Sequence, residues 1–204
     1  MMLDSSINNF LDELGSKAPV PGGGSTSALV GALATALGRM SGALTVGKKK
    51  YADVENDLRD MMDRAQELRE KLCACVQKDI DAFEPLSKAY AIPKDDPNRD
   101  EIMEKCLKTA ASAPLEILDL CCEVTALNKE FSEKAGRLVI SDAATGAALC
   151  WAALHGAALN VKVNTSAMKD RAYAGSVEQH VDEALEKYSG MAEETFYSVY
   201  GRYS

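Results

Sequence analysis

A chain of 204 residues with 31 acidic and 23 basic side chains carries a net charge of −8. That charge excludes a general attraction to nucleic acid or to anionic membranes, because both require a basic surface. Hydrophobic residues make up 47% of the chain, which is typical of a globular protein with a sizeable core. We expect one domain over residues 1–204, because no repeat or low-complexity linker divides the sequence.

The cell compartment is predicted from three negative signals. The first 15 residues are acidic and lack the basic start of a signal peptide, and the longest apolar run, residues 28–46, is interrupted by Arg39. The cysteine spacings C-x-C and C-C are not those of zinc sites. We therefore expect a cytoplasmic protein with no membrane span, no metal and buried, reduced thiols. The cysteines are Cys73, Cys75, Cys106, Cys121, Cys122 and Cys150.

After a short first helix at residues 7–14, a glycine-rich segment opens the second predicted helix. Pro21 is followed by Gly22, Gly23, Gly24 and Ser25, and then by very small residues. Backbone N–H groups at a helix start have no partner within the helix and lie at its positive end, so they suit an anionic or carbonyl-rich ligand. No strand precedes the glycines and no G-K-[ST] ends them, which argues against a nucleotide loop. The alternative is that the glycines serve close helix packing.

Two predicted helices carry a stripe of small residues. On the second helix the stripe consists of Ser27, Gly31, Thr35, Gly38 and Gly42, and on a later helix it consists of Gly146, Ala153 and Gly156. Because glycine costs helix stability, such a stripe indicates close approach of another helix or of a flat ligand. The sequence alone does not decide between the two.

A lysine patch follows the second helix. Lys48, Lys49, Lys50 and Tyr51 come directly after Gly47. In an acidic chain these lysines form a local positive patch that suits the carboxylate tail of a ligand. The alternative is an ordinary solvated loop.

The longest predicted helix spans residues 53–89. Its apolar residues recur in steps of three and four, as in a bundle seam. Asp79 occupies a seam position, where a carboxylate must be hydrogen-bonded, paired or protonated, and such groups concentrate at functional sites. Asp81 lies roughly 160° away around the helix, so the two carboxylates are not expected to act as a pair.

Three further helices complete the chain. One begins at Asp100, is kinked or restarted by Pro114, and ends before Gly136. The next is capped by Ser141 and Asp142 and extends to about residue 168, and the last spans residues 176–200. The fold class predicted is all-α: an antiparallel up-and-down bundle of long helices, six to eight in number.

One face of the helix after residue 141 looks like a ligand wall. It carries Asp142, Gly146, Leu149, Ala153, Gly156 and Asn160, with Asn164 close by. Asp142 and Asn160 are five turns apart, about 27 Å along the axis. An elongated ligand, or two separate roles, is therefore implied, although capping alone would also explain Asp142.

Six segments, in this order along the chain, resemble the formiminotransferase-cyclodeaminase C-terminal domain family, which includes stand-alone methenyltetrahydrofolate cyclohydrolases. The resemblance covers roughly residues 5–195. Its segments are residues 19–25 (PVPGGGS), 47–51 (GKKKY), 78–83 (KDIDAF), 114–116 (PLE), 141–142 (SD) and 159–164 (LNVKVN).

The resemblance implies a helical, dimeric protein with a reduced folate as substrate and no metal or redox cofactor. Members hydrolyse 5,10-methenyltetrahydrofolate to 10-formyltetrahydrofolate, or cyclise 5-formiminotetrahydrofolate with loss of ammonia. We favour the cyclohydrolase; the cyclodeaminase and a folate-binding bundle without turnover are the alternatives.

On this basis we expect the following roles for individual residues. Asp79 or Asp142 is the expected catalytic carboxylate, with Lys78 orienting the substrate. The expected substrate-binding residues are Gly22, Gly23, Gly24, Ser25, Lys48, Lys49, Lys50, Tyr51, Asp81, Ser141, Asn160 and Asn164.

Overall fold

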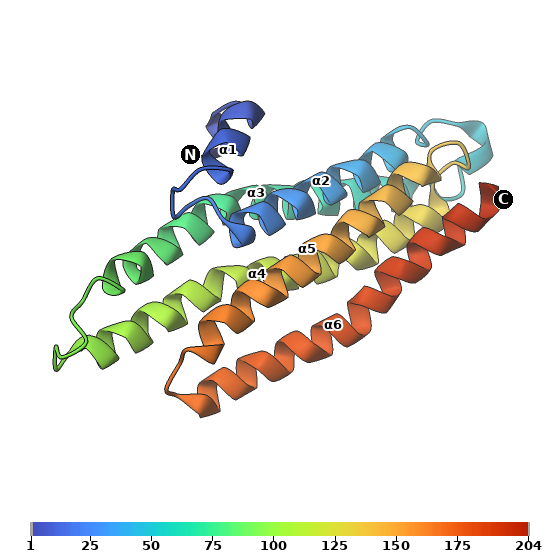
Figure 1. Cartoon of the computed structure of the whole chain (residues 1–204). Helices are drawn as coiled ribbons and strands as arrows, with labels where there is room; N and C mark the ends of the chain where they lie inside the picture. Colours follow the sequence, from blue (N-terminus) through green and yellow to red (C-terminus); the bar gives the residue numbers. More distant parts are fainter. Residues whose placement is uncertain (1, 204) are drawn as a thin grey trace.

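The structure, a computed structural model, describes residues 2–203 and is built from helices. The α-helices are α1 (Ile7–Leu14), α2 (Gly23–Ala43), α3 (Glu55–Ala89), α4 (Arg99–Lys134), α5 (Ile140–Ser166) and α6 (Arg171–Tyr200). Short 3-10 helices lie at Met2–Asp4, Lys49–Tyr51 and Gly201–Tyr203. Residues 2–203 contain no strand, and long consecutive helices run in opposite directions (Figure 1). The predicted all-α antiparallel bundle is confirmed.

Helix α5 lies at the centre of the bundle. It packs against α2, α4 and α6, while α3 packs against α2 and α4. Helix α1 projects from the bundle beside the start of α2 (Figure 1), and its main neighbour is the short helix Met2–Asp4. This arrangement leaves one side of α2 and α5 open.

The small-residue stripes are helix-packing surfaces. A Cβ atom on Gly146 would lie 2.8 Å from the Ala34 carbonyl oxygen of α2, and one on Gly31 would lie 2.9 Å from Cys121 Sγ of α4. A Cβ atom on Gly156 would overlap the Ser27 hydroxyl. Real Cβ atoms essentially never approach so closely, so these glycines let α2 settle against α4 and α5.

The predicted seam of α3 is confirmed. Seven of its residues are buried, namely Leu58, Met61, Ala65, Leu68, Leu72, Cys75 and Leu86. The period breaks near Asp79, which is half-buried.

The predicted starts of α5 and α6 are wrong. Ser141 and Asp142 do not cap α5, which begins one residue earlier, at Ile140, with no side-chain cap. A turn at Gly136, whose carbonyl accepts from the N–H groups of Val139 and Ile140, already sets the helical path. Helix α6 begins at Arg171 rather than Ser176, because the Asp170 side chain accepts the Tyr173 N–H at 3.1 Å and caps it.

Pro114 does not restart its helix, because α4 is continuous from Arg99 to Lys134. A proline lacks the N–H that would bond the carbonyl four residues earlier, here that of Ala110. Asn164 of α5 donates its Nδ2–H to the Ala110 oxygen at 3.3 Å. A side chain from the neighbouring helix therefore supplies the hydrogen bond that Pro114 removes.

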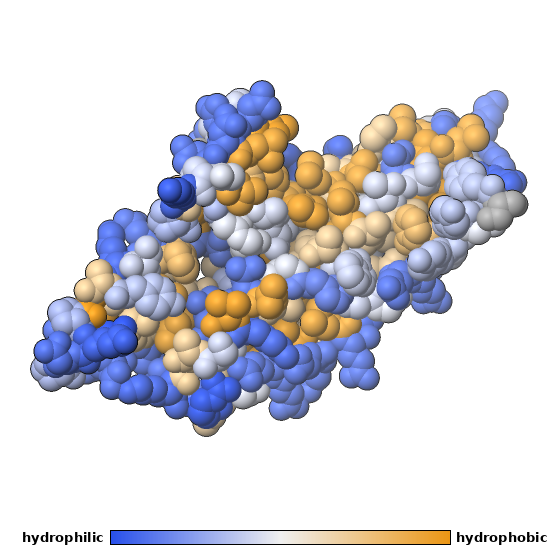
Figure 2. Space-filling view, in the orientation of Figure 1, coloured by the Kyte–Doolittle hydropathy of each residue, from blue (hydrophilic) through white to orange (hydrophobic). Residues whose placement is uncertain are grey.

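Helices α2 and α5 share an exposed apolar surface, called here the α2–α5 face. Its large exposed side chains are Leu33 and Met40 of α2, Leu44 directly after α2, and Trp151, Leu159 and Val163 of α5; Trp151 lies at the edge of the face beside α6, where it lines a hollow with Phe196 and Tyr197. Figure 2 shows apolar residues gathered along these helices. By length and composition alone, α5 could cross a membrane, and half of its most apolar stretch is buried in the bundle.

We predict that Asn164 and Pro114 are energetically coupled. Asn164→Ala should lower the free energy of unfolding by about 1–3 kcal/mol, because it leaves the buried Ala110 carbonyl unpaired. In a Pro114→Ala background the new N–H restores the helical bond, so the same substitution should cost at least about 1 kcal/mol less. Urea unfolding of the four proteins measures this, and a coupling energy near zero would contradict the assignment.

Candidate functional site

A pocket of about 200 Å³ opens where the start of α2 meets the last turns of α5. We call it the Asp79 pocket. Helices α3 and α4 supply the rest of its wall, and the segment before α2 covers one side. Its lining residues are Pro19, Val20, Gly22, Gly23, Gly24, Asp79, Phe83, Ala110, Pro114, Asn160, Val163 and Asn164.

Asp79 of α3 is the acidic side chain of this pocket. The Ser25 hydroxyl donates to Asp79 Oδ2 at 2.7 Å, and the Ser25 backbone N–H also bonds the carboxylate. Burial raises the pKa of Asp79 above its ordinary 3.8, while the two hydrogen bonds from Ser25 oppose that rise. The result is a fixed, partly desolvated carboxylate whose proton affinity is higher than that of an ordinary aspartate.

The glycines are explained by this carboxylate. Gly22 is the N-cap of α2, and Gly23 and Gly24 form its first turn, so the helix begins two residues before the predicted start at Ser25. Among the described residues Gly47 is the one glycine with a positive φ, so backbone angles do not explain the glycines at positions 22–24. A Cβ atom on Gly24 would lie 2.8 Å from Asp79 Oδ2, and one on Gly23 would lie 2.7 Å from Asn160 Nδ2.

The predicted anion site at this helix start is therefore engaged by the protein itself. Asp79 takes the position that an external anion would take at the positive end of α2. Positions 23 and 24 require glycine because Asn160 and Asp79 lie so close to the helix start.

The two asparagines of α5 line the same pocket. Asn160 donates its Nδ2–H to the Gly156 carbonyl at 2.8 Å, and Asn164 donates to the Asn160 carbonyl at 2.9 Å and to Ala110. These bonds hold both amides in place. The side-chain oxygen of Asn160 takes part in none of these three hydrogen bonds.

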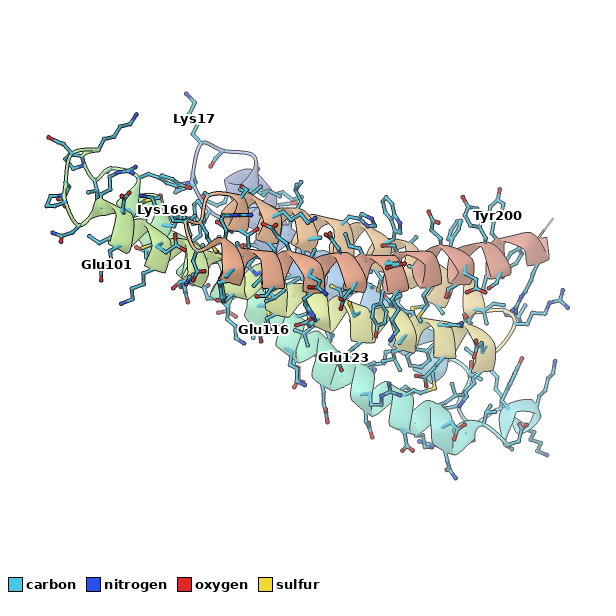
Figure 3. The ribbon with its side chains drawn as sticks, turned by 90° about the horizontal axis from the view of Figure 1, so that it is seen from below. Lys17, Glu101, Glu116, Glu123, Lys169 and Tyr200 are labelled. Carbon is cyan, nitrogen blue, oxygen red and sulfur yellow. The ribbon has the colours of Figure 1, made fainter. Side chains whose placement is uncertain are left out.

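Lys78 and Asp81 lie outside the pocket. Lys78 Nζ forms an exposed ion pair with Glu116 Oε1 at 2.6 Å, and Glu116 lies at the outside of the bundle (Figure 3). This partner raises the pKa of the lysine. Asp81 is exposed and accepts from Gln77 Nε2 at 2.9 Å. As expected from their angle on the helix, Asp79 and Asp81 do not form a pair.

The remaining predicted residues gather at the opposite end of α5. Ser141 is exposed and Asp142 is half-buried in the first turn of α5, about 27 Å along the axis from Asn160. A second cavity of about 370 Å³ lies beside them, and we call it the loop-end pocket. It is lined by Lys48, Lys50, Tyr51, Gly136, Arg137, Leu138 and Val139, and Lys49 is exposed next to it.

Six lining residues of the Asp79 pocket were not among the predicted site residues. Pro19, Val20, Phe83, Pro114 and Val163 lie in segments that carry the family resemblance, which was the available signal. Ala110 carries no signal in the sequence, because small and apolar residues are common everywhere in a bundle.

We predict unequal losses of stability from substitutions of two nearby glycines. Gly24→Ala should lower the free energy of unfolding by about 1–3 kcal/mol, because its methyl group would displace the Asp79 carboxylate. Gly22→Ala is the comparison: a Cβ atom there meets nothing within 4 Å and its φ of −133° suits alanine, so only the poorer N-cap should count, at less than about 1 kcal/mol. Thermal unfolding followed by circular dichroism compares them, and equal shifts in Tm would contradict this account.

Comparison with known proteins identifies the family of this fold and site. Residues 6–183 match the family described as formiminotransferase-cyclodeaminase. The chain is 38% identical over 198 residues to a methenyltetrahydrofolate cyclohydrolase of Methylorubrum extorquens, covering 94% of this chain and 90% of that protein. It is 32% identical to a formimidoyltransferase-cyclodeaminase of Dictyostelium discoideum, covering 88% of this chain and 33% of that longer protein.

A solved structure agrees. The crystal structure of a formiminotetrahydrofolate cyclodeaminase from Thermotoga maritima superposes with a TM-score of 0.83 at 28% identity, covering 98% of this chain and 96% of that one. The chain therefore belongs to the formiminotransferase-cyclodeaminase family.

Proposed function

We propose that this protein is a methenyltetrahydrofolate cyclohydrolase, which hydrolyses 5,10-methenyltetrahydrofolate to 10-formyltetrahydrofolate. The observation that carries the proposal is the half-buried Asp79, held by Ser25 on the wall of a pocket. The cyclohydrolase relative supports it, because the two chains match over nearly their whole lengths.

The chemistry suits a carboxylate. The methenyl carbon lies between two nitrogens that share a positive charge, so an ionised Asp79 stabilises the bound cation. As a general base, Asp79 accepts a proton from the water that attacks this carbon. The adduct then collapses: the bond from carbon to N5 breaks, N5 takes the proton from Asp79, and the hydroxyl proton leaves as the formyl group forms.

The raised pKa of Asp79 serves this role. A general base is most effective when its pKa lies near the working pH, provided that it stays ionised at neutral pH. Burial moves the pKa of Asp79 in that direction. In this proposal Asn160 and Asn164, which line the pocket, bind the polar edge of the pterin ring, and the flat ring lies beside the glycine backbone.

The proposed reaction requires no metal or redox cofactor. The amidinium carbon is already electrophilic, and its oxidation state does not change during hydrolysis. The reactants are therefore water, the folate and the protein's own side chains.

Cyclodeaminase activity is the second candidate. The Thermotoga maritima protein with this fold is described as a cyclodeaminase, and its chain is matched over 96% of its length. In that reaction N10 attacks the formimino carbon and an acid protonates the departing ammonia, a role that protonated Asp79 would fill. A folate-binding bundle without turnover is the third candidate, and a desolvated carboxylate in a pocket argues against it.

We place the protein in the cytoplasm. All six cysteines are free, and Cys75, Cys121, Cys122 and Cys150 are buried. Burial raises the pKa of the Cys75 and Cys122 thiols to about 12, which disfavours the reactive thiolates. Such thiols suit a reducing compartment.

We also propose that the protein is a homodimer through the α2–α5 face. No Asp, Glu, Lys or Arg occurs on α5 between Asp142 and Lys162, and Arg39 is the one charged residue of α2. A surface of this kind marks an interaction site on a protein that is not embedded in a membrane. Trp151, which stacks on His155 at 4.2 Å between ring centroids, is the aromatic anchor that such interfaces favour.

We predict that Asp79→Asn lowers kcat at least about 100-fold, because asparagine cannot accept the proton from water. The Tm should not fall: asparagine still accepts the Ser25 hydroxyl, and it removes a charge that burial disfavours. Loss of methenyl absorbance measures hydrolysis, and its appearance from 5-formiminotetrahydrofolate measures the deaminase. Exposed Asp60 on the same helix supplies the control, Asp60→Asn. Unchanged turnover in Asp79→Asn would refute Asp79 as the base.

The pH dependence follows from the same group. Because the ionised carboxylate is the active form, kcat/KM should fall as the pH drops through the pKa of Asp79, at a pH above 3.8. The residual activity of Asp79→Asn should lack this acidic limb. An acidic limb that is identical in both proteins would show that another group titrates.

We predict that Trp151→Glu raises the dimer dissociation constant at least about 30-fold, the effect of losing an aromatic anchor worth about 2 kcal/mol. Light scattering after size exclusion measures the mass. Ile102→Glu on α4 is the matched control, since Ile102 is 39% exposed and lies off the face. A wild-type monomer, or a protein that sediments with lipid vesicles, would contradict the dimer.

A further inference from the structure

The side-chain amide of Asn164 can offer a ligand only its oxygen. Its Nδ2 lies 2.9 Å from the Asn160 carbonyl oxygen and 3.3 Å from the Ala110 carbonyl oxygen, so both of its N–H groups are donated within the protein. Because a carbonyl oxygen is an acceptor, a flipped amide would lose both bonds. The atom that is left for a ligand is Oδ1, which is itself an acceptor.

This oxygen has no hydrogen-bond partner among the residues that the structure describes. Asn164 is 9% exposed and lines the Asp79 pocket. Within residues 2–203, three buried side-chain atoms lack both a partner and contact with solvent, and Oδ1 of Asn164 is not one of them, so it is open to the pocket. An acceptor in such a place loses free energy if a ligand covers it without supplying an N–H or O–H group.

The place of Asn164 in the pocket follows from the helices. Asp79 and Asn160 lie side by side, because they contact the consecutive glycines Gly24 and Gly23 at the start of α2. Asn164 comes one helical turn after Asn160, about 6 Å further toward the end of α5. A ring whose reacting atom lies beside Asp79 therefore reaches Asn164 with an edge remote from that atom.

The pocket wall around Asn164 is otherwise apolar. Here the end of α3 and the start of α4 lie at the same end of the bundle as the end of α5 (Figure 1). They contribute Phe83, Ala110 and Pro114 to the wall, and α5 adds Val163. These four side chains have no hydrogen-bonding atom. A flat ring that packs on them therefore meets one side-chain acceptor and has to turn a donor toward it.

We propose that Asn164 is a specificity-determining residue, whose Oδ1 accepts a hydrogen bond from the 2-amino group of the pterin. This inference rests on the proposed function and gives the orientation of its substrate. With the methenyl carbon beside Asp79, the pyrimidine half of the pterin extends toward Asn164. That half carries the 2-amino group and N3–H, and the 2-amino group is its outermost donor.

A substrate analogue tests the hydrogen bond in the wild-type protein. In this analogue of 5,10-methenyltetrahydrofolate a methyl group replaces the 2-amino group, which keeps the shape of the ring and removes the donor. Its KM should be at least about tenfold higher than that of the normal substrate, because Oδ1 is covered without a partner. The kcat should change less than about threefold, since the methyl group is remote from the reacting carbon. Loss of methenyl absorbance measures both constants.

Two variants assign this preference to Asn164. In Pro114→Ala the Ala110 carbonyl regains an N–H from its own helix, so Asn164 can be replaced without leaving that carbonyl unpaired. The bond to the Asn160 carbonyl still orients the Asn164 amide in this variant. The KM ratio of the two substrates should stay near tenfold in Pro114→Ala. It should fall below about twofold in Pro114→Ala/Asn164→Leu, because leucine keeps the size of asparagine without the acceptor.

The ratio compares two substrates on one protein, so a general loss of stability or turnover cancels. A tenfold ratio that persists in the double variant would overturn the proposal and leave Asn164 a structural role alone. Equal KM values in the wild-type protein, a comparison that needs no variant, would overturn it too, while methenyltetrahydrofolate hydrolysis still stood. A wild-type protein that turns over neither folate would refute the proposed function itself, so the two failures are distinguishable.

Discussion

The site depends on one contact, between the Asp79 carboxylate of α3 and the first turn of α2. The hydroxyl and N–H groups of Ser25 bond this carboxylate, which takes up donors that the helix leaves unpaired. Gly24 must lack a side chain for the carboxylate to fit. The same burial that locks two helices together raises the pKa of Asp79. The group that fixes the start of α2 is therefore also the group best suited to chemistry.

The pocket lies where regular helical hydrogen bonding is interrupted. The start of α2 leaves N–H groups free, and Pro114 leaves the Ala110 carbonyl free. Asp79 and Asn164 satisfy these groups from neighbouring helices, so polar side chains gather in an otherwise apolar bundle. Close packing of α2 on α5, allowed by Gly146 and Gly156, then brings Asn160 to the same place. The site is polar because these side chains supply the hydrogen bonds that the helix backbone lacks there.

Periodicity predicted the bundle and the α3 seam, because burial imposes a repeat of three and four residues, and Asp79 was conspicuous as a break in that repeat. Helix starts were harder to predict: Ser141 and Asp142 have capping side chains, but the turn at Gly136 had already set the path of α5. Lys78 adjoins Asp79 in sequence yet points to Glu116, since neighbouring helical residues diverge by about 100°. The distance along α5 between Asp142 and the Asp79 pocket was predictable from helical rise. The presence of a separate pocket at each end of the helix was not.

The desolvated Asp79 has a consequence for how tightly the substrate and the product of the proposed reaction are bound. Before the substrate arrives, ionised Asp79 lacks a cationic partner among its hydrogen bonds, since both come from Ser25. Methenyltetrahydrofolate brings a positive charge at the reacting ring, and 10-formyltetrahydrofolate has none there. The pocket therefore attracts the substrate electrostatically and loses that attraction once the ring opens. The neutral product is therefore held less tightly than the cationic substrate, so that substrate binding and product release share one electrostatic cause.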